Sequence, residues 1–305
     1  MRFENTQVSG FEAAFRGARN PKNSWNLSDS YFGLVDINAD VPDIEITDIA
    51  DKWVQFSHPE LDWPNVFTDK GCDLTDKYAA KLYKNGTLRF DEKNEIIDAA
   101  YIGPKDMKLA QTLIKAGPEH RKFLRQIFVS VDITAPLYIW KELDTYKIAT
   151  VANSQSTMHK LDSKPITLDC FEVDDFNPDL IYYTLPEYAY NPNEIAGNNI
   201  GMLSDLIIEQ LEFLRQKYVE TKDKKYWKEL VRWLPEGWLQ TRTWTANYET
   251  IRAICSPGQR RFHKLNEWGG VDNNNVSTFI KWARTLPYAQ YLIFDDENVP
   301  FQIEK

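Results

Sequence analysis

Residues 134–160 read TAPLYIWKELDTYKIATVANSQSTMHK, an apolar segment that gives way to small polar residues. The apolar part predicts a helix that Thr134 or Ala135 caps, with Pro136 in the first turn, where a missing backbone N–H is tolerated. The preceding segment FVSVDI, residues 128–133, alternates apolar and polar residues and therefore predicts a half-buried strand. We therefore expect a strand at residues 128–133 that leads directly into a helix.

The polar residues 150–157 predict an exposed loop, because hydroxyl and amide groups are costly to bury without partners. In such a loop Asn153, Ser154 and Ser156 are positioned to hold a phosphate or a ring edge, with Lys147 as the nearby positive charge. The alternative is a solvated connector or a helix-capping segment, since Ser, Thr and Asn are common in both.

The composition is that of a globular protein with a sizeable core: 305 residues, 43% of them hydrophobic and 27% charged. A net charge of −9 argues against a general nucleic-acid-binding protein. The longest apolar runs are too short for a membrane span, and the N-terminal residues lack the apolar core of a signal peptide. The three cysteines form no CxxC pair, and the four histidines belong to no zinc signature. We therefore expect a reduced, cytoplasmic protein with no membrane, nucleic-acid or metal partner.

The chain divides into three zones. Residues 1–25 combine an apolar start with a basic loop. Residues 26–103 are acidic and interrupted by prolines, and LYKNGTLRF within them predicts a hairpin that turns at Asn85-Gly86. The remainder is mostly helical in pattern. We expect one domain over residues 1–305, in which the acidic zone is an insertion or elaboration.

A long amphipathic helix is predicted beyond residue 198, and core packing is the expected role of its apolar stripe. The stripe consists of Leu203, Leu206, Ile207, Leu211, Leu214 and Tyr218.

Basic residues gather in the segment 230–268 of this acidic chain. They are Arg232, Arg242, Arg252, Arg260, Arg261, His263 and Lys264. Guanidinium groups match phosphate and carboxylate groups bidentately, so the segment is a candidate anion site. The alternative is that these side chains pair with surface carboxylates.

Taken together, the two segments resemble the flavin-dependent thymidylate synthase family. That family has an Ala-Pro helix start, an Arg-His-Arg triplet and an Asn-Glu-x-Ser-x-Arg-Tyr run. Counting forward from Ala135-Pro136 places the triplet on Thr145-Tyr146-Lys147, and one inserted residue aligns Asn153 and Ser156 with the Asn and Ser of the run. The family's earlier His-x-Ser/Thr-Pro-Phe-Glu segment falls on residues 120–125.

The C-terminal motifs follow in the same order as in the family. These motifs are Leu-Pro, Trp-Thr-x-Asn and His-x-x-x-Glu. They correspond to Leu234-Pro235, Trp244-Thr245-Ala246-Asn247 and His263-Lys264-Leu265-Asn266-Glu267. The resemblance covers roughly residues 104–160 and 200–290.

The resemblance implies an α+β fold with an antiparallel sheet flanked by helices, assembled as a homotetramer. It also implies FAD as cofactor, a deoxyuridine monophosphate type of pyrimidine deoxynucleotide as substrate, and NADPH and methylenetetrahydrofolate as co-substrates. The substrate-binding residues that it implies, together with the polar loop, are Glu142, Lys147, Asn153, Ser154, Ser156, Arg232, Arg260 and Arg261. The cofactor-binding residues that it implies are His120, Lys122, Arg125, Thr145, Tyr146, Asn247 and His263.

Departures from the family pattern leave three interpretations open. Of the diagnostic triplet only Lys147 is basic, Glu142 stands in place of a Gln, and Thr157 or Met158 stands in place of an Arg. The chain is then a divergent synthase, a non-catalytic relative that binds a nucleotide or flavin, or a scaffold for protein contacts. Cys255 could suggest the unrelated cysteine-dependent thymidylate synthases. A lone Cys on an apolar helical stripe is, however, typical of packing, so we interpret Cys255 as a core residue.

Overall fold

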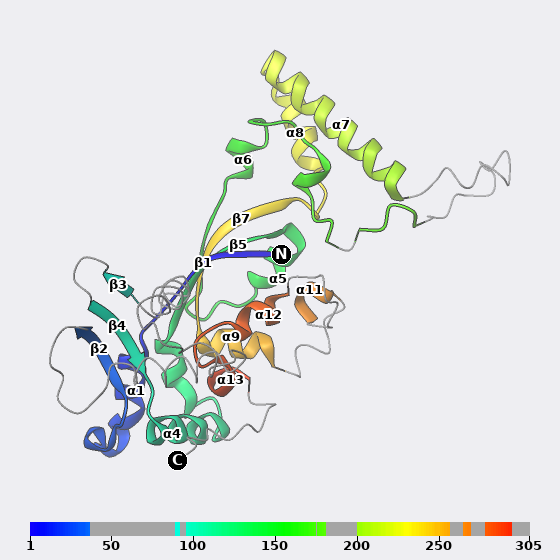
Figure 1. Ribbon diagram of the computed structural model, residues 1–305. Coiled ribbons are helices and arrows are strands. Elements are labelled where there is room, and N and C mark those ends of the chain that lie inside the picture. Colours follow the sequence, from blue (N-terminus) through cyan, green and yellow to red (C-terminus); the bar gives the residue numbers. More distant parts are fainter. Residues whose placement is uncertain are drawn as a thin grey trace, which may run out of the picture.

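The computed structural model describes residues 1–36, 89–91, 96–174, 176–180, 200–256, 265–269 and 278–294. At its centre lies a four-stranded antiparallel sheet with strand order β1-β5-β7-β6 (Figure 1). Its strands are β1 (Arg2–Ser9), β5 (Phe128–Pro136), β6 (Val151–Ser154) and β7 (Leu239–Asn247). Segments from the beginning, the middle and the last third of the chain therefore meet in one sheet.

Strand β5 confirms the alternation predicted for residues 128–133. Val129, Val131 and Ile133 are buried, and the side chains between them face the opposite side of the sheet. There the hydroxyl of Ser130 hydrogen-bonds the hydroxyl of Thr245 on β7, at 2.7 Å. One face of the sheet is thus apolar and covered, while the other is polar.

The predicted start of the helix is wrong by one or two residues. Strand β5 continues to Pro136, which pairs with Leu239 of β7, and helix α5 begins only at Leu137 and ends at Leu143. Pro136 itself is the N-cap residue, with extended backbone angles. Pairing with β7 carries the strand past the residues whose local pattern suggested a cap.

The predicted polar loop is also partly a strand. Residues Val151–Ser154 form β6, which pairs with β7 so that Asn153 lies opposite Thr243 and Ser154 opposite Arg242. Both Asn153 and Ser154 are exposed. Because both side chains are in contact with water, their polar groups carry no burial cost there. Only the residues after Ser154 leave the sheet.

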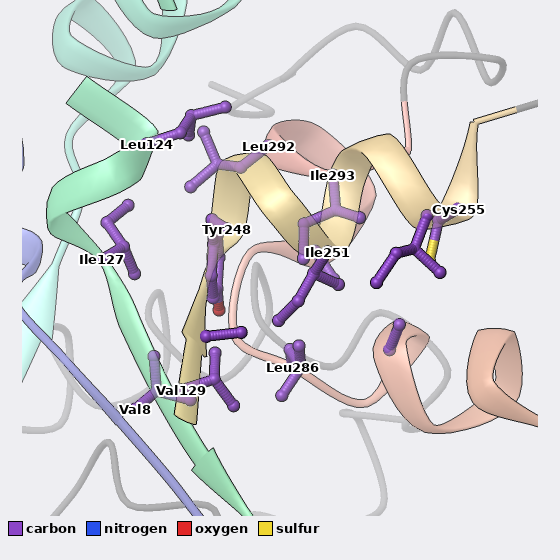
Figure 2. Packing of buried hydrophobic residues seen from close by; sticks show 14 of the residues in the cluster. Val8, Leu124, Ile127, Val129, Tyr248, Ile251, Cys255, Leu286, Leu292 and Ile293 are labelled. Carbon is purple, nitrogen blue, oxygen red and sulfur yellow. The ribbon is translucent and has the colours of Figure 1, made fainter. Parts of the chain in front are cut away.

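Helices pack against the apolar face of the sheet and form the larger hydrophobic core. They are α1 (Phe11–Arg19), α4 (Pro104–Lys115), α9 (Tyr248–Cys255), α11 (Asn266–Gly269), α12 (Phe279–Arg284) and α13 (Ala289–Leu292). Figure 2 shows Tyr248 and Ile251 of α9 among Leu286, Leu292 and Ile293. Cys255 is buried in this core, as the packing interpretation predicted.

Short 3₁₀ helices connect these elements. They are η1 (Asn20–Lys22), η2 (Trp25–Leu27), η4 (Arg121–Gln126) and η5 (Leu168–Cys170).

A second antiparallel sheet, in the order β2-β4-β3, forms from the described residues of the acidic zone. Its strands are β2 (Tyr31–Asp36), β3 (Arg89–Asp91) and β4 (Ile96–Tyr101). Figure 1 shows this sheet beside α1, at the end of the molecule opposite to α7. The turn predicted at Asn85-Gly86 lies outside the described residues.

A smaller hydrophobic cluster, which we call the second cluster, lies beyond the end of the four-stranded sheet that points away from the β2-β4-β3 sheet (Figure 1). It consists of the buried residues Leu161, Ile166, Cys170, Phe171, Leu211 and Leu230. The long helix predicted after residue 198 is α7 (Ile200–Thr221), and it pairs there with α8 (Lys224–Arg232). Of the predicted stripe only Leu211 is fully buried, and Leu206 is 55% exposed.

The described elements have an α+β fold, an antiparallel sheet flanked by helices, as the sequence predicted. Among the described residues, no helix combines the length and the apolar character needed to cross a membrane.

Candidate functional site

A cavity of about 560 Å³ lies between the end of the four-stranded sheet and the second cluster. Its lining combines cationic groups, hydroxyls and an indole ring. These residues are Arg2, Thr134, Gln155, Ser156, Thr157, Lys160, Leu161, Ser163, Lys164, Asp169, Cys170, Trp238, Leu239, Gln240 and Thr241. The end of the polar segment 150–157 therefore forms part of its wall.

The sheet sets the position of this wall. As the chain leaves β6, the amide of Gln155 donates to the carbonyl oxygen of Thr241 on β7, at 2.8 Å. Ser156 is then the N-cap of the short helix α6 (Thr157–Lys160). The segment turns from the sheet toward the second cluster, where Leu161 is buried.

Helix α7 holds the far side of the cavity in place. A carboxylate oxygen of Glu212 accepts a hydrogen bond from the amide of Ile166 at 2.8 Å and from Arg215 at 2.7 Å. The hydrogen bonds from Arg215 lower the pKa of Glu212 to about 2, against the opposing effect of burial. Arg215 also donates to the carbonyl of Asp162 at 3.1 Å. The segment that carries Ser163 and Lys164 is therefore fixed at both ends.

The electrostatics of the cavity favour an anion. Arg2, which also forms an exposed ion pair with Glu4, lines it together with Lys160 and Lys164. Asp169 is the one carboxylate among the lining residues that the structure describes. Strand pairing brings in Arg2, because this residue lies opposite Thr134 of β5. Ammonium and guanidinium groups beside hydroxyls are typical of sites for phosphate groups.

A hydrogen-bonded chain supports the cavity from behind. Gln240 is 7% exposed, and its amide nitrogen donates to the carbonyl of Gln155 and to the hydroxyl of Thr157, at 2.8 and 3.1 Å. Its amide oxygen accepts from Arg242 at 2.9 Å, and Arg242 in turn donates to the carboxylate of Asp144. Helix α5, strand β7 and the cavity wall are thus connected through side chains.

Of the substrate-binding residues that the sequence predicted, the structure places Ser156 in the cavity. Asn153 and Ser154 lie on the exposed edge strand before it. Arg232, at the end of α8, forms an ion pair with Glu229.

The remaining substrate candidates lie apart from the cavity or cannot be placed. Glu142 is half-buried on α5, and Lys147 is exposed in the turn that follows this helix. Arg260 and Arg261 lie outside the described residues.

The predicted cofactor residues that the structure describes fall into two groups. His120, Lys122 and Arg125 are exposed in and before η4, which packs against α9. Between them, Arg121 forms an ion pair with Glu249 of α9. His263 lies outside the described residues.

The second group surrounds the start of β6. Tyr146 lies against Trp268, with ring centroids 6.0 Å apart, and burial together with Glu142 raises its pKa. The hydroxyl of Thr145 donates to the carbonyl of Glu142. The amide of Asn247 donates to the carbonyl of Ile148 and accepts from Thr250, so both of its polar groups serve the fold.

These positions can be compared with the needs of FAD, which carries a diphosphate and a flat ring system. The exposed basic side chains of His120, Lys122 and Arg125 fit an anionic diphosphate. Asn247 is buried, and its side chain already bonds Ile148 and Thr250 at the start of α9. The fit therefore rests on the basic residues of the η4 segment.

Sequence reasoning did not assign Arg2, Lys160, Lys164 and Gln240 to the site. Lys160 and Lys164 lie three and seven residues after the polar run 150–157, so this proximity was an available signal. Arg2 and Gln240 had no local signal, because strand pairing alone brings them to residues 155–164. Among the described residues, no group of three or more His, Cys, Asp or Glu side chains is arranged to hold a metal ion.

Comparisons with known proteins give a structural likeness. No family model matches the sequence, and a search of curated proteins finds no match. The flavin-dependent thymidylate synthase ThyX of Helicobacter pylori, complexed with FAD and dUMP, aligns over 97% of this chain and 99% of its own, with a TM-score of 0.50 at 13% identity. A UMP/dUMP methylase, PolB of Streptomyces cacaoi bound with 5-Br UMP, aligns over 62% of this chain and 82% of its own, with a TM-score of 0.39 at 12% identity. The likeness to ThyX shows a shared fold.

Proposed function

We propose that this chain is a flavin-dependent enzyme that transfers a one-carbon group to C5 of a pyrimidine nucleotide of the deoxyuridine monophosphate type. The observation that carries the proposal is the cavity at the end of β6. It lies where the sequence resemblance predicted a phosphate loop, in a chain whose fold is that of ThyX. Sequence motif and fold thus support the same class of enzyme independently.

The cavity suits a nucleotide monophosphate in size and charge. Cavities of this volume are typical of small-molecule sites. Lys160, Lys164 and Arg2 would neutralise the phosphate, while Ser156 and Thr157 would donate to its oxygens. Trp238, whose ring packs edge-on against Phe171, offers an apolar wall for the pyrimidine.

The cofactor belongs to the same proposal. FAD, when bound, supplies the reducing equivalents, drawn from NADPH, that convert the methylene group of methylenetetrahydrofolate into a methyl group. The contribution of the protein is to hold the two ring systems in register and to neutralise phosphates. His120, Lys122 and Arg125 would hold the diphosphate of the cofactor.

A second candidate is a non-catalytic relative that binds a nucleotide or flavin. It is favoured by the residues at the family triplet, where Thr145 bonds the carbonyl of its own helix and Tyr146 packs on Trp268. Asn247, a predicted cofactor ligand, is likewise committed to the fold. This candidate retains the anion-binding cavity and lacks turnover.

Three measurements on the purified protein test the proposal. We expect a visible absorbance change on titration with FAD, heat of binding on titration with deoxyuridine monophosphate, and a methylated nucleotide after incubation with FAD, NADPH and methylenetetrahydrofolate. Binding of both ligands without product would favour the second candidate. Binding of neither would leave only a role in protein contacts.

Assembly and organisation complete the proposal. We expect a homo-oligomer, most simply a tetramer, because apolar side chains such as Leu206, Phe213 and Trp233 are at least half exposed on α7 and after α8. We treat residues 1–305 as one domain in which residues 26–103 are an elaboration, and we expect a cytoplasmic location.

A further inference from the structure

The side-chain amide of Gln240 has only one orientation that its neighbours accept. Its Oε1 lies 2.9 Å from Nε of Arg242, a group that can only donate hydrogen bonds. Its Nε2 lies 2.8 Å from the backbone carbonyl of Gln155, a group that can only accept. Both neighbours therefore require the same orientation, although the two ends of an amide are alike in size.

This orientation decides the role of the hydroxyl of Thr157. Nε2 of Gln240 is also 3.1 Å from Oγ1 of Thr157, so the amide donates and the hydroxyl accepts. A hydroxyl has one proton of its own to donate. In the described part of the chain this proton has no acceptor, and Thr157 lines the cavity. The hydroxyl is thus prepared as a donor toward a ligand.

The rigidity of the arrangement comes from β7 and α5. Arg242 lies over the ring of Trp140, 4.4 Å from its centroid, and also bonds the carboxylate of Asp144. Gln240 is buried at 7% exposure, so water is a poor substitute for its partners. A ligand would meet a donor whose direction is already set, which lowers the entropy cost of binding.

We propose that Thr157 donates a hydrogen bond to the phosphate of the bound nucleotide, and that Gln240, oriented by Arg242, is its positioning residue. The identity of the ligand rests on the proposed function. The phosphate is favoured over the pyrimidine as acceptor because Lys160 and Lys164 line the same cavity. A fully ionised phosphate carries no proton, so its oxygens can only accept hydrogen bonds. A donor whose direction is already fixed therefore suits it.

The test compares affinities of wild type and variants by calorimetric titration with deoxyuridine monophosphate, deoxyuridine and inorganic phosphate. Thr157→Val removes the hydroxyl at nearly constant shape, and Thr157→Ser retains it. Gln240→Glu keeps an acceptor for Arg242 and removes both N–H donors. Thr221→Val, an exposed position whose hydroxyl bonds the carbonyl of Lys217 on α7, is the matched control for the Thr-to-Val change.

We expect Thr157→Val to weaken deoxyuridine monophosphate and inorganic phosphate by about ten- to a hundredfold, the effect of one hydrogen bond to a charged group. Thr157→Ser should restore most of the affinity, and Thr221→Val should match wild type. Gln240→Glu should weaken binding similarly. The double variant Thr157→Val, Gln240→Glu should bind with the same affinity as the single variant that binds less tightly, because both changes remove the same contact.

The outcomes separate this inference from the proposed function. Equal affinity of wild type and Thr157→Val for the nucleotide overturns the inference alone, and so does a loss confined to ligands that contain the pyrimidine. If the losses of binding free energy in the two single variants add up in the double variant, Gln240 does not act by positioning Thr157. If phosphate binds through Thr157 but the nucleotide binds no better than phosphate, the proposed function fails and the inference stands. If wild type binds none of the three ligands, both fail. Should Gln240→Glu not fold, the two Thr157 variants decide.

Discussion

The guanidinium group of Arg242 lies 4.4 Å from the centroid of the Trp140 ring, and the indole N–H of Trp140 donates to the backbone carbonyl of Gln240 at 2.9 Å. Trp140 is fully buried on α5, and both of its partners are on β7. One aromatic side chain therefore fixes the strand residues that support the cavity.

Replacing this side chain by Trp140→Phe should lower the free energy of unfolding by about 1–3 kcal/mol, because the buried carbonyl of Gln240 loses its donor. Urea denaturation followed by fluorescence or circular dichroism measures the change. Trp25→Phe is the control, since Trp25 is 50% exposed and such positions change stability by about 0.5 kcal/mol or less. Equal stability of wild type and Trp140→Phe would contradict the role given to the indole N–H.

A buried ion pair joins α1 to α4, and removing one partner should be strongly destabilising. The carboxylate of Asp106, which is 0% exposed, accepts hydrogen bonds from Arg19, Ser28 and Ser30. Asp106→Asn leaves Arg19 buried without a counter-charge and should cost about 3–5 kcal/mol, measured by urea denaturation. Glu220→Gln, which breaks an exposed pair with Lys217, should leave the free energy of unfolding nearly unchanged, because water screens this pair. Similar losses of stability in Asp106→Asn and Glu220→Gln would show that the buried pair is no more important to stability than the exposed one.

Glu212 predicts a pH-dependent contribution to stability. Hydrogen bonds from Arg215 lower its pKa to about 2 from an ordinary value of 4.5, and its side chain is 19% exposed. A lowered pKa means that the contribution is fully present above pH 4.5 and is lost as the pH falls toward 2. Glu212→Gln should therefore be about 2–3 kcal/mol less stable than wild type at pH 7. The difference should narrow below pH 4.5 in denaturation experiments between pH 3 and 8, and a constant difference would count against this assignment.

The basic residues of the cavity can be separated from those predicted by sequence. Lys160→Ala and Lys164→Ala should each weaken deoxyuridine monophosphate by about tenfold or more, since each removes a cation from the cavity lining. Arg232→Ala distinguishes two predictions: the sequence resemblance expects a similar loss, whereas the ion pair with Glu229 on α8 predicts unchanged affinity. Calorimetric titration of the three variants decides, and unchanged affinity in both lysine variants would remove the cavity as the phosphate site.

The exposed apolar residues of α7 predict self-association. Phe213 is 50% exposed and Leu206 is 55% exposed, two turns apart on the helix. We expect light scattering to give a mass well above the 35.6 kDa of one chain, and Phe213→Glu to lower it. Glu209→Gln, an exposed change on the same helix, should leave the mass unchanged. A wild-type monomer at micromolar concentration would require the site to be complete within one chain.

The family resemblance predicted the α+β class. Local patterns in the sequence determined the strand at 128–133, the long helix after residue 198 and the packing role of Cys255. Each of these follows from local periodicity or from the apolar character of neighbouring residues, which act over a few positions. The binding role predicted for the polar run stays a prediction, and Ser156 of this run lines the cavity.

Only the tertiary structure decided that Val151–Ser154 form an edge strand and that β5 extends to Pro136. Both depend on β7, whose residues lie about a hundred positions away and whose free backbone groups outweigh local loop and cap preferences. The pairing of β7 with β6 brings Gln240 to Thr157, and the pairing of β1 with β5 brings Arg2 to Thr134. A hydrogen bond between residues distant in sequence has no periodic signature, so the orientation of the cavity wall became visible only once the sheet was assembled.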